Sequence, residues 1–141
     1  MNLRNSIDWM RHAVRLGAED LLTGTELNLA AFEMSTASMI FKDGRGLVDF
    51  SAVTDASART DDMVFFLISL NKLVRLRVAV VLPSGKVSDH VTGAVRAVGL
   101  RHIRPFQSEI EALEWLNEGA PPERLLAAKA KQEPSVSEAT E

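Results

Sequence analysis

Segments with helical and with strand-like periodicity alternate along the chain. Thr23 and Glu26 have the spacing of a capping box, and the apolar residues that follow fall on one helical face until Asp43-Gly44 ends the helix. Thr60 is a candidate cap for a second helix that begins with acidic residues. The pattern predicts helices over residues 23–42, 60–74, 86–98 and 108–119, and strands over 47–51, 77–82 and 102–106.

Two of these segments are apolar on nearly every side. The run from Met63 to Ile68 predicts a helix that is deeply packed, because such a helix needs cover on more than one side. The run from Arg77 to Leu82 is rich in β-branched residues and is typical of a strand covered on both faces. Both runs indicate a layered domain with a central sheet.

The N-terminal stretch 7–18 fits two patterns. Its apolar residues alternate as in a strand up to Leu16, whereas Ile7, Met10 and Val14 also fit one face of a helix. We interpret it as a strand because it completes a β-α series, which predicts an α/β fold of about four mostly parallel strands packed with three to four helices. The expected core consists of Leu47, Val48, Phe50, Phe65, Leu67, Ile68, Val78, Val80, Ile103 and Leu113.

The composition changes at Gly119. From there the chain continues as Gly-Ala-Pro-Pro and then as mixed Ala, Lys, Glu and Ser with few large apolar residues. Such a segment buries too little surface to offset its chain entropy. We therefore expect one domain over residues 6–119 and a disordered tail over 120–141.

Composition and charge exclude several classes of function. The 141 residues suit one domain, and 46% hydrophobic with 25% charged residues is typical of a soluble globular protein. A net charge of −3 argues against a nucleic-acid partner, and the absence of cysteine excludes disulfides, thiolate zinc sites and a cysteine nucleophile. Because no apolar run approaches the roughly 20 residues of a membrane span and no signal-peptide core follows Met1, we expect a cytoplasmic protein with no membrane span.

Motifs of catalysis and cofactor binding are missing from the sequence. It contains no G-x-G-x-x-G, no P-loop lysine and no G-x-S-x-G elbow. The three histidines lack metal-ligand spacing, since Asp89 and His90 are adjacent and would point about 100° apart on a helix. We expect no enzymatic activity, no cofactor and no metal.

Four segments resemble a known family. Gly46–Val53, which reads GLVDFSAV, is similar to the second conserved strand of STAS domains, the fold of anti-sigma-factor antagonists. Arg77–Leu82, Ile103–Phe106 and Glu111–Leu116 look like the SpoIIAA-like, or STAS/SEC14, branch of that family. The resemblance covers about residues 10–118, and it implies a STAS/SpoIIAA-like fold with a regulatory, non-enzymatic role.

The chain departs from the family at the phosphorylated turn. In phosphorylatable STAS domains the strand leads into D-S-S-G or D-S-x-G, whose serine is the switch. Here Val53–Thr60 reads VTDASART, so Asp55, Ser57 and Thr60 stand in the right region without the D-S pair or the glycine. Helix capping is the other interpretation of Ser57 and Thr60, and it is the one we favour. We expect Ser57 to stay unphosphorylated.

Polar residues follow two of the predicted strands. Asp49, Ser51, Thr54 and Asp55 lie in or after one strand, and Ser84-Gly85 follows the next along the chain. Carboxyl ends of parallel strands are where α/β folds place ligands, although the same residue types also serve ordinary turns. Basic residues at strand starts form a candidate patch for an acidic partner or a lipid headgroup, or else ordinary solvated charge: Lys72, Arg75, Arg77, Arg101 and Arg104.

Two hypotheses of function follow. The first is an interaction or regulatory domain that binds a protein partner or itself, with a homodimer expected because the 63–70 helix is apolar nearly all round. The alternative is a SEC14-like module that binds a small apolar molecule or a lipid near Asp49, Thr54, Ser57 and Ser84.

Overall fold

The computed structural model describes residues 4–41, 43–56, 60–72, 76–82 and 102–127, and it describes only the backbone of residues 54–56 and 60. Five strands, three helices and one 3-10 turn lie in these ranges. In chain order they are β1 (Arg4–Asp8), β2 (Ala13–Leu22), α1 (Gly24–Ile40), β3 (Gly44–Ala56), α2 (Thr60–Leu70), β4 (Leu76–Val81), β5 (Ile103–Phe106), α4 (Glu109–Asn117) and η1 (Pro122–Arg124).

The strands form one mixed sheet in the order β1-β2-β3-β4-β5. β1 is antiparallel to β2, and the other three pairings are parallel. The α/β class and the mostly parallel sheet are as the sequence predicts, with a fifth strand added. β3 is longer than its apolar run because its ladder with β2 extends to Ala56, past two register shifts.

The fifth strand arises because residues 7–18, which the sequence analysis interpreted as one strand, include parts of both β1 and β2. Residues 9–12 form a turn between β1 and β2, so Met10 and His12 lie outside both strands. The Asp8 carboxylate accepts hydrogen bonds from the backbone N–H of Arg11 and from its guanidinium, and His12 has a left-handed φ of 52°. The alternation of apolar and polar residues does not reveal such a hairpin, because the side chains of both strands alternate with the same period of two.

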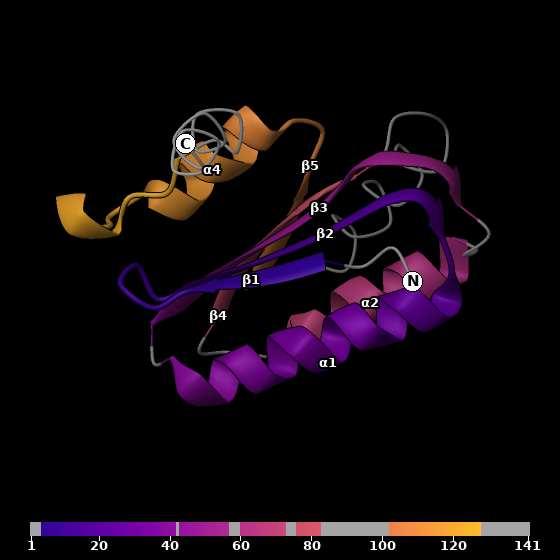
Figure 1. Ribbon diagram of the computed structural model, residues 1–141, viewed down its shortest axis with the longest axis horizontal. Coiled ribbons are helices and arrows are strands. Elements are labelled where there is room, and N and C mark those ends of the chain that lie inside the picture. The colour runs from indigo at the N-terminus through magenta and orange to yellow at the C-terminus, as the bar shows by residue number, and fades with distance from the viewer. Residues whose placement is uncertain (1–3, 42, 57–59, 73–75, 83–101, 128–141) are drawn as a thin grey trace, which may run out of the picture.

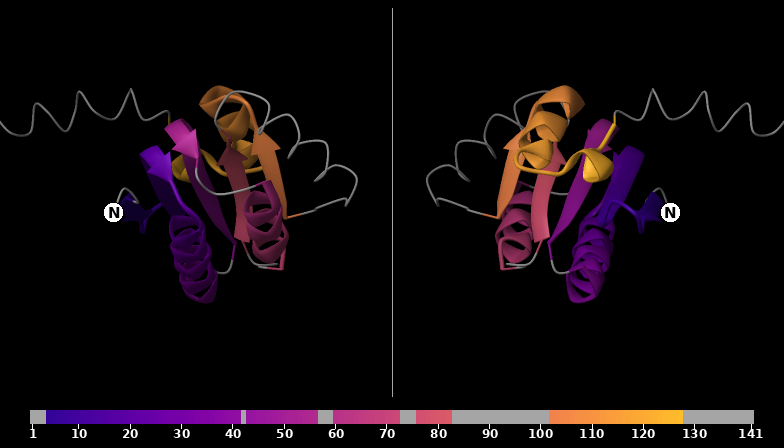
Figure 2. Two further views of the ribbon diagram at one scale, coloured as in Figure 1. Left: turned by 90° about the vertical axis from the view of Figure 1, so that its right-hand side faces the viewer. Right: turned by 90° about the vertical axis from the view of Figure 1, so that its left-hand side faces the viewer.

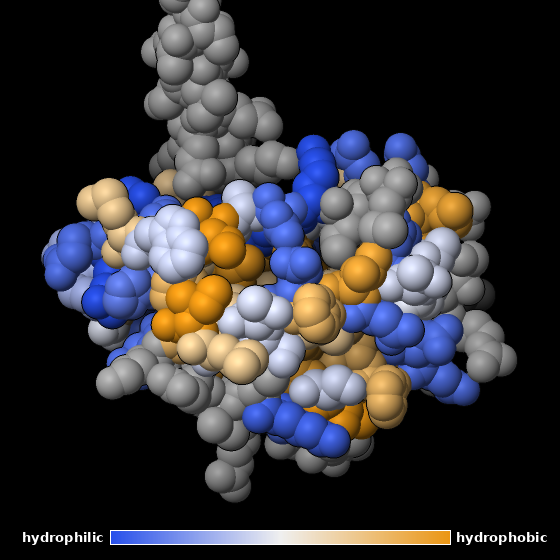
Figure 3. Space-filling model, turned by 60° about the horizontal axis from the view of Figure 1, so that its bottom comes forward, coloured by the Kyte–Doolittle hydropathy of each residue, from blue (hydrophilic) through white to orange (hydrophobic). Residues whose placement is uncertain are grey.

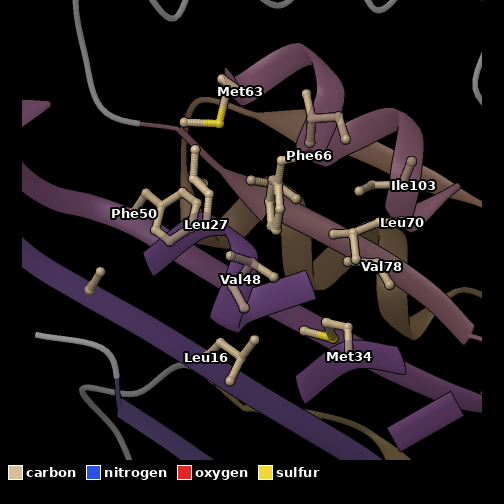
Figure 4. Close-up of a cluster of buried hydrophobic side chains, with 14 of the residues drawn as sticks. Leu16, Leu27, Met34, Val48, Phe50, Met63, Phe66, Leu70, Val78 and Ile103 are labelled. Carbon is tan, nitrogen blue, oxygen red and sulfur yellow. The ribbon is translucent and has the colours of Figure 1, made fainter. Parts of the chain in front are cut away.

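Helices cover both faces of the sheet. α1 and α2 pack on one face and α4 on the other, which gives three layers (Figures 1 and 2). Successive strand residues therefore alternate between two cores, as Val14 and Leu16 face α1 and α2 while Ala13 faces α4. The larger core joins Leu16, Val48, Phe50 and Val78 of the sheet to Leu27, Met34, Met63, Phe66 and Leu70 of the two helices (Figure 4).

Phe65 does not belong to this core, although the sequence placed it there. Its side chain is 69% exposed, whereas Phe66 and Leu67 are buried against the sheet. Ile68 is only partly buried. The prediction for Phe65 was wrong because an apolar run has no period, and only the packing of the helix decides which side faces outward.

The predicted starts of α1 and α4 are confirmed by their caps. The Thr23 hydroxyl accepts a hydrogen bond from the backbone N–H of Glu26 at 3.2 Å, and the Glu26 carboxylate accepts one from Thr23 N at 3.0 Å. The Ser108 hydroxyl accepts from Glu111 N at 3.3 Å at the start of α4. Each cap satisfies backbone donors that the helix itself leaves unpaired.

The packed part of the chain continues past the expected boundary at residue 119. Leu126 is buried beside α4, and it exchanges two hydrogen bonds with the Asn117 side chain, at 2.8 and 3.0 Å. Leu126 is thus packed against the domain beyond residue 119. The predicted helix over 86–98 and the rest of the expected tail, residues 128–141, lie outside the described residues.

Candidate functional site

Among the polar residues predicted to follow the strands at the candidate ligand or switch site (Asp49, Thr54, Asp55, Ser57, Thr60, Ser84 and Gly85), Asp49 alone has a side chain that the structure describes. Its Oδ1 accepts hydrogen bonds from the backbone N–H and the hydroxyl of Ser51, at 2.9 and 2.6 Å. Thr54 and Asp55 continue β3, and Thr60 begins α2, with only their backbones described. Ser57, Ser84 and Gly85 lie outside the described residues. The structure therefore shows hydrogen bonds between Asp49 and Ser51. That Asp49 clusters with the other predicted site residues remains a prediction.

A hollow of about 310 Å³ surrounds Asp49 on the α4 side of the sheet. We call it the sheet-face groove. β2 and β3 are in register with Gly17 opposite Asp49, and the groove extends to β1 and to the first residue of α4. Its charged lining residues are Arg4, Arg15, Glu19, Asp49 and Glu109.

Charges in the sheet-face groove are mostly paired. Arg15 lies 3.6 Å from Glu109, and Arg4 lies 3.4 Å from Glu19. Burial lowers the pKa of the Arg15 guanidinium, and the nearby carboxylates, Glu109 first, oppose that shift. A second acceptor of Arg15 is the backbone carbonyl of Ala127. This groove is thus polar and nearly balanced in charge.

The sequence did not point to Arg15, Glu19 or Glu109 as neighbours of Asp49. Alternation along β2 does put Arg15, Gly17 and Glu19 on one face, but the register that sets them beside Asp49 depends on long-range pairing. Glu109 arrives from a helix 60 positions further along the chain. No local sequence pattern predicts that Glu109 lies in the same groove as Asp49.

Part of the predicted basic patch is assembled at the other end of the sheet. The guanidinium carbons of Arg77 and Arg104 lie 4.0 and 5.1 Å from the centre of the Trp115 ring. Lys72 is exposed, and Arg75 and Arg101 lie outside the described residues. Trp115 is the residue that sequence reasoning missed, since its segment Glu111–Leu116 served only for the family resemblance.

Histidines and carboxylates form no metal cluster in the described ranges, where no three such side chains come together. The His12 ring stacks on Phe41 at 5.3 Å, and the backbone N–H of His102 donates to Asn71 Oδ1 at 2.8 Å. His90 lies outside those ranges. None of the helices described is long and apolar enough to cross a membrane.

Comparison with known proteins identifies the fold. No family model and no curated protein matches the chain. Among solved structures, the chain is similar to the anti-sigma factor antagonist SpoIIAA in its unphosphorylated form, with a TM-score of 0.54 and 14% identity over 84% of this chain and 99% of that one. It is also similar to an uncharacterized protein with a SpoIIAA-like fold from Shewanella loihica PV-4, with a TM-score of 0.52 and 16% identity over 82% and 93%.

These similarities define the class of the domain. It is a mixed, mostly parallel sheet between helical layers, and its arrangement is that of the SpoIIAA-like, or STAS, fold. The resemblance stated from the sequence is confirmed for the fold. At this level of identity the similarity extends no further than the fold.

Proposed function

We propose that this chain is a non-enzymatic interaction domain that acts in regulation through protein contacts and forms a homodimer. The main support for the proposal is the outer face of α1 and α2. There Phe32, Met39 and Phe65 are 66%, 78% and 69% exposed, and Figure 3 shows apolar side chains at the surface on this side of the molecule. Exposed apolar groups gathered in one region are typical of interaction surfaces, and aromatic residues are typical anchors.

Low charge on the α1 part of this face favours a second copy as the occupant. α1 has two charged residues, Glu26, which is buried in the capping box, and Glu33, which accepts a hydrogen bond from Asn5 of β1. A twofold axis places the same patch against itself, so like charges there would repel. The exposed residues around Phe32 and Met39 carry no charge: Thr25, Asn28 and Thr36.

Light scattering after size exclusion tests the homodimer. The wild-type chain is expected at about twice its monomer mass of 15.5 kDa at micromolar concentration. The double substitution Phe32→Asp with Phe65→Asp is expected to give a monomer, because it buries two carboxylates in the interface. Ile110→Asp is the matched control, since Ile110 is 68% exposed on α4, on the other side of the sheet. A wild-type monomer up to about 100 µM would refute self-association.

The fold supports the regulatory part of the proposal. SpoIIAA, which this chain resembles in fold, is an anti-sigma factor antagonist. The alternative of a SEC14-like apolar or lipid site near Asp49 gains no support from the sheet-face groove, which is lined by paired charges. Pull-down from a lysate with the wild type and the Phe32→Asp, Phe65→Asp variant distinguishes a protein partner bound on this face from one bound elsewhere.

We further propose that Ser57 is not a phosphorylation switch. The turn lacks the D-S pair and glycine of the family's switch, and Asp55, Asp61 and Asp62 would surround a phosphate with like charge. Intact-mass and peptide mass spectrometry of protein purified from its native host is expected to show no phosphate on Ser57 or Thr60. Stoichiometric phosphate on either residue would contradict the proposal.

A further inference from the structure

A second hollow, of about 590 Å³, lies at the amino ends of β3, β4 and β5, beside the end of α4 and η1. In Figure 1 the amino ends of β3 and β4 and the turn η1 lie toward the left. Four arginines line it against two carboxylates, which leaves two positive charges in excess in a chain of net charge −3. We call it the arginine groove, and its charged residues are Arg45, Arg77, Arg104, Arg124, Asp43 and Glu118.

Trp115 orients two of these arginines. Trp115 is 8% exposed, and the centre of its ring lies 5.7 Å from that of Phe106 and 4.0 and 5.1 Å from the guanidinium carbons of Arg77 and Arg104. A guanidinium stacked on an aromatic ring keeps its N–H edges free for an oxyanion. Arg77 Nη2 lies 3.1 Å from Glu118, whereas the ion pairs found between described residues do not include Arg104.

Arg77 also holds a donor without an acceptor. Its Nε is buried and has no hydrogen-bond partner among the residues that the structure describes. A buried donor left unpaired costs free energy that a bound acceptor would recover. This unpaired donor belongs to a residue that lines the groove, and it is an observation independent of the charge count.

Arg45 adds a buried cation to the wall of the groove. It is 6% exposed and donates to Asn117 Oδ1 and the Arg11 carbonyl, each at 3.1 Å, and to the Arg124 carbonyl. These acceptors are neutral, so its charge is not cancelled by contact. Burial lowers the pKa of the Arg45 guanidinium, and the charge of Arg124 lowers it further.

We propose that the arginine groove binds a dianionic phosphate group, either of a soluble phosphate monoester or of a lipid headgroup. Planar guanidinium forks match the oxygens of phosphate, and an excess of two positive charges matches a dianion better than a single carboxylate. The site lies at the opposite strand ends from Thr54 and Asp55 and is separate from the outer face of α1 and α2. It therefore stands apart from the proposed dimer.

Trp115 fluorescence provides the test in the full chain. The chain has two tryptophans, so Trp9→Phe leaves Trp115 as the sole reporter. Glycerol 3-phosphate is titrated with glycerol and acetate as controls, and phosphatidic acid vesicles are compared with phosphatidylcholine vesicles. We expect a saturable change with glycerol 3-phosphate, with phosphatidic acid or with both, and none with glycerol or phosphatidylcholine. Acetate is expected to bind at least about tenfold more weakly.

Two matched variants locate the site. Arg104→Gln is expected to weaken phosphate binding at least about tenfold, because it removes a charge-assisted donor. Arg4→Gln changes the same charge on β1, outside the groove, and is expected to weaken it less than about twofold. Thermal unfolding followed by circular dichroism checks that both variants are folded as the parent is.

The possible outcomes distinguish a soluble phosphate monoester from a lipid headgroup, and both from the absence of phosphate binding. Saturation with glycerol 3-phosphate identifies a soluble monoester, and saturation with phosphatidic acid vesicles alone identifies a lipid headgroup. No saturable change with either up to about 10 mM phosphate would overturn the proposal. Equal weakening of phosphate binding by Arg104→Gln and Arg4→Gln would overturn the proposal as well. The effect would then depend on the net charge of the protein and not on a contact in the groove.

Discussion

Arg45 shows how one residue connects distant parts of the chain. Its guanidinium joins β3 to the β1–β2 turn through the Arg11 carbonyl, to α4 through Asn117 and to η1 through the Arg124 carbonyl. It does so at a position that is 6% exposed. Buried arginine without a carboxylate partner is costly, and three well-placed acceptors offset much of that cost.

Arg45→Ala is expected to lower the free energy of unfolding by about 2–4 kcal/mol, because three partly buried acceptors lose the Arg45 donor. Urea denaturation followed by circular dichroism measures it. Arg4→Ala removes the same side chain from an exposed ion pair and is expected to change stability by no more than about 0.5 kcal/mol. Equal effects of the two substitutions would show that the hydrogen bonds of Arg45 contribute little.

At the scale of an element, α1 depends on its first turn and on one buried side. Leu27, Ala30, Met34 and Ala37 face the sheet, and the Thr23–Glu26 capping box fixes where the helix begins. The outer side combines small polar residues with Phe32 and Met39, so it lacks the charged surface typical of a solvated helix. Its stability in the monomer therefore comes from the cap and the inner side.

Thr23→Ala is expected to lower the free energy of unfolding by about 1 kcal/mol, since it removes the oxygen that accepts from Glu26 N. Thr25→Ala is the control two residues away, where the side chain is exposed and caps nothing. Chemical denaturation of both variants checks the prediction. A loss of stability with Thr25→Ala as large as with Thr23→Ala would rule out the cap as the cause.

At the scale of the whole molecule, Leu126 extends the core that lies under α4. Leu126 packs into the smaller core with Ala13, Leu47 and Ala79, which belong to three different strands. The exchange of hydrogen bonds with Asn117 fixes the segment in place. Leu126 therefore belongs to this core although it lies beyond the boundary that composition suggests.

Leu125 and Leu126 are adjacent but differ in burial, so substitutions at the two positions form a matched comparison. Leu126→Ala is expected to lower the free energy of unfolding by about 2 kcal/mol, because Leu126 is buried. Leu125→Ala is expected to change it by less than about 0.5 kcal/mol, since Leu125 is 44% exposed. Differential scanning calorimetry on both proteins measures the difference. Indistinguishable unfolding temperatures would show that the segment detaches before the domain unfolds.

The sequence by itself determined the order and type of most elements. Periodicity and caps are local properties, so α1, α2, β4, β5 and α4 are found within a few residues of their predicted positions. The resemblance to STAS domains rested on the order of these same segments, and the solved SpoIIAA structure bears it out for the fold.

Only the tertiary structure decided which side chains meet. The β2–β3 register brings Arg15 and Gly17 alongside Asp49, and the approach of α4 to the sheet puts Trp115 under Arg77 and Arg104. The outward direction of Phe65 depends likewise on how α2 packs. These contacts join residues far apart in the chain, and their geometry follows from the packing of whole elements, which no local pattern encodes.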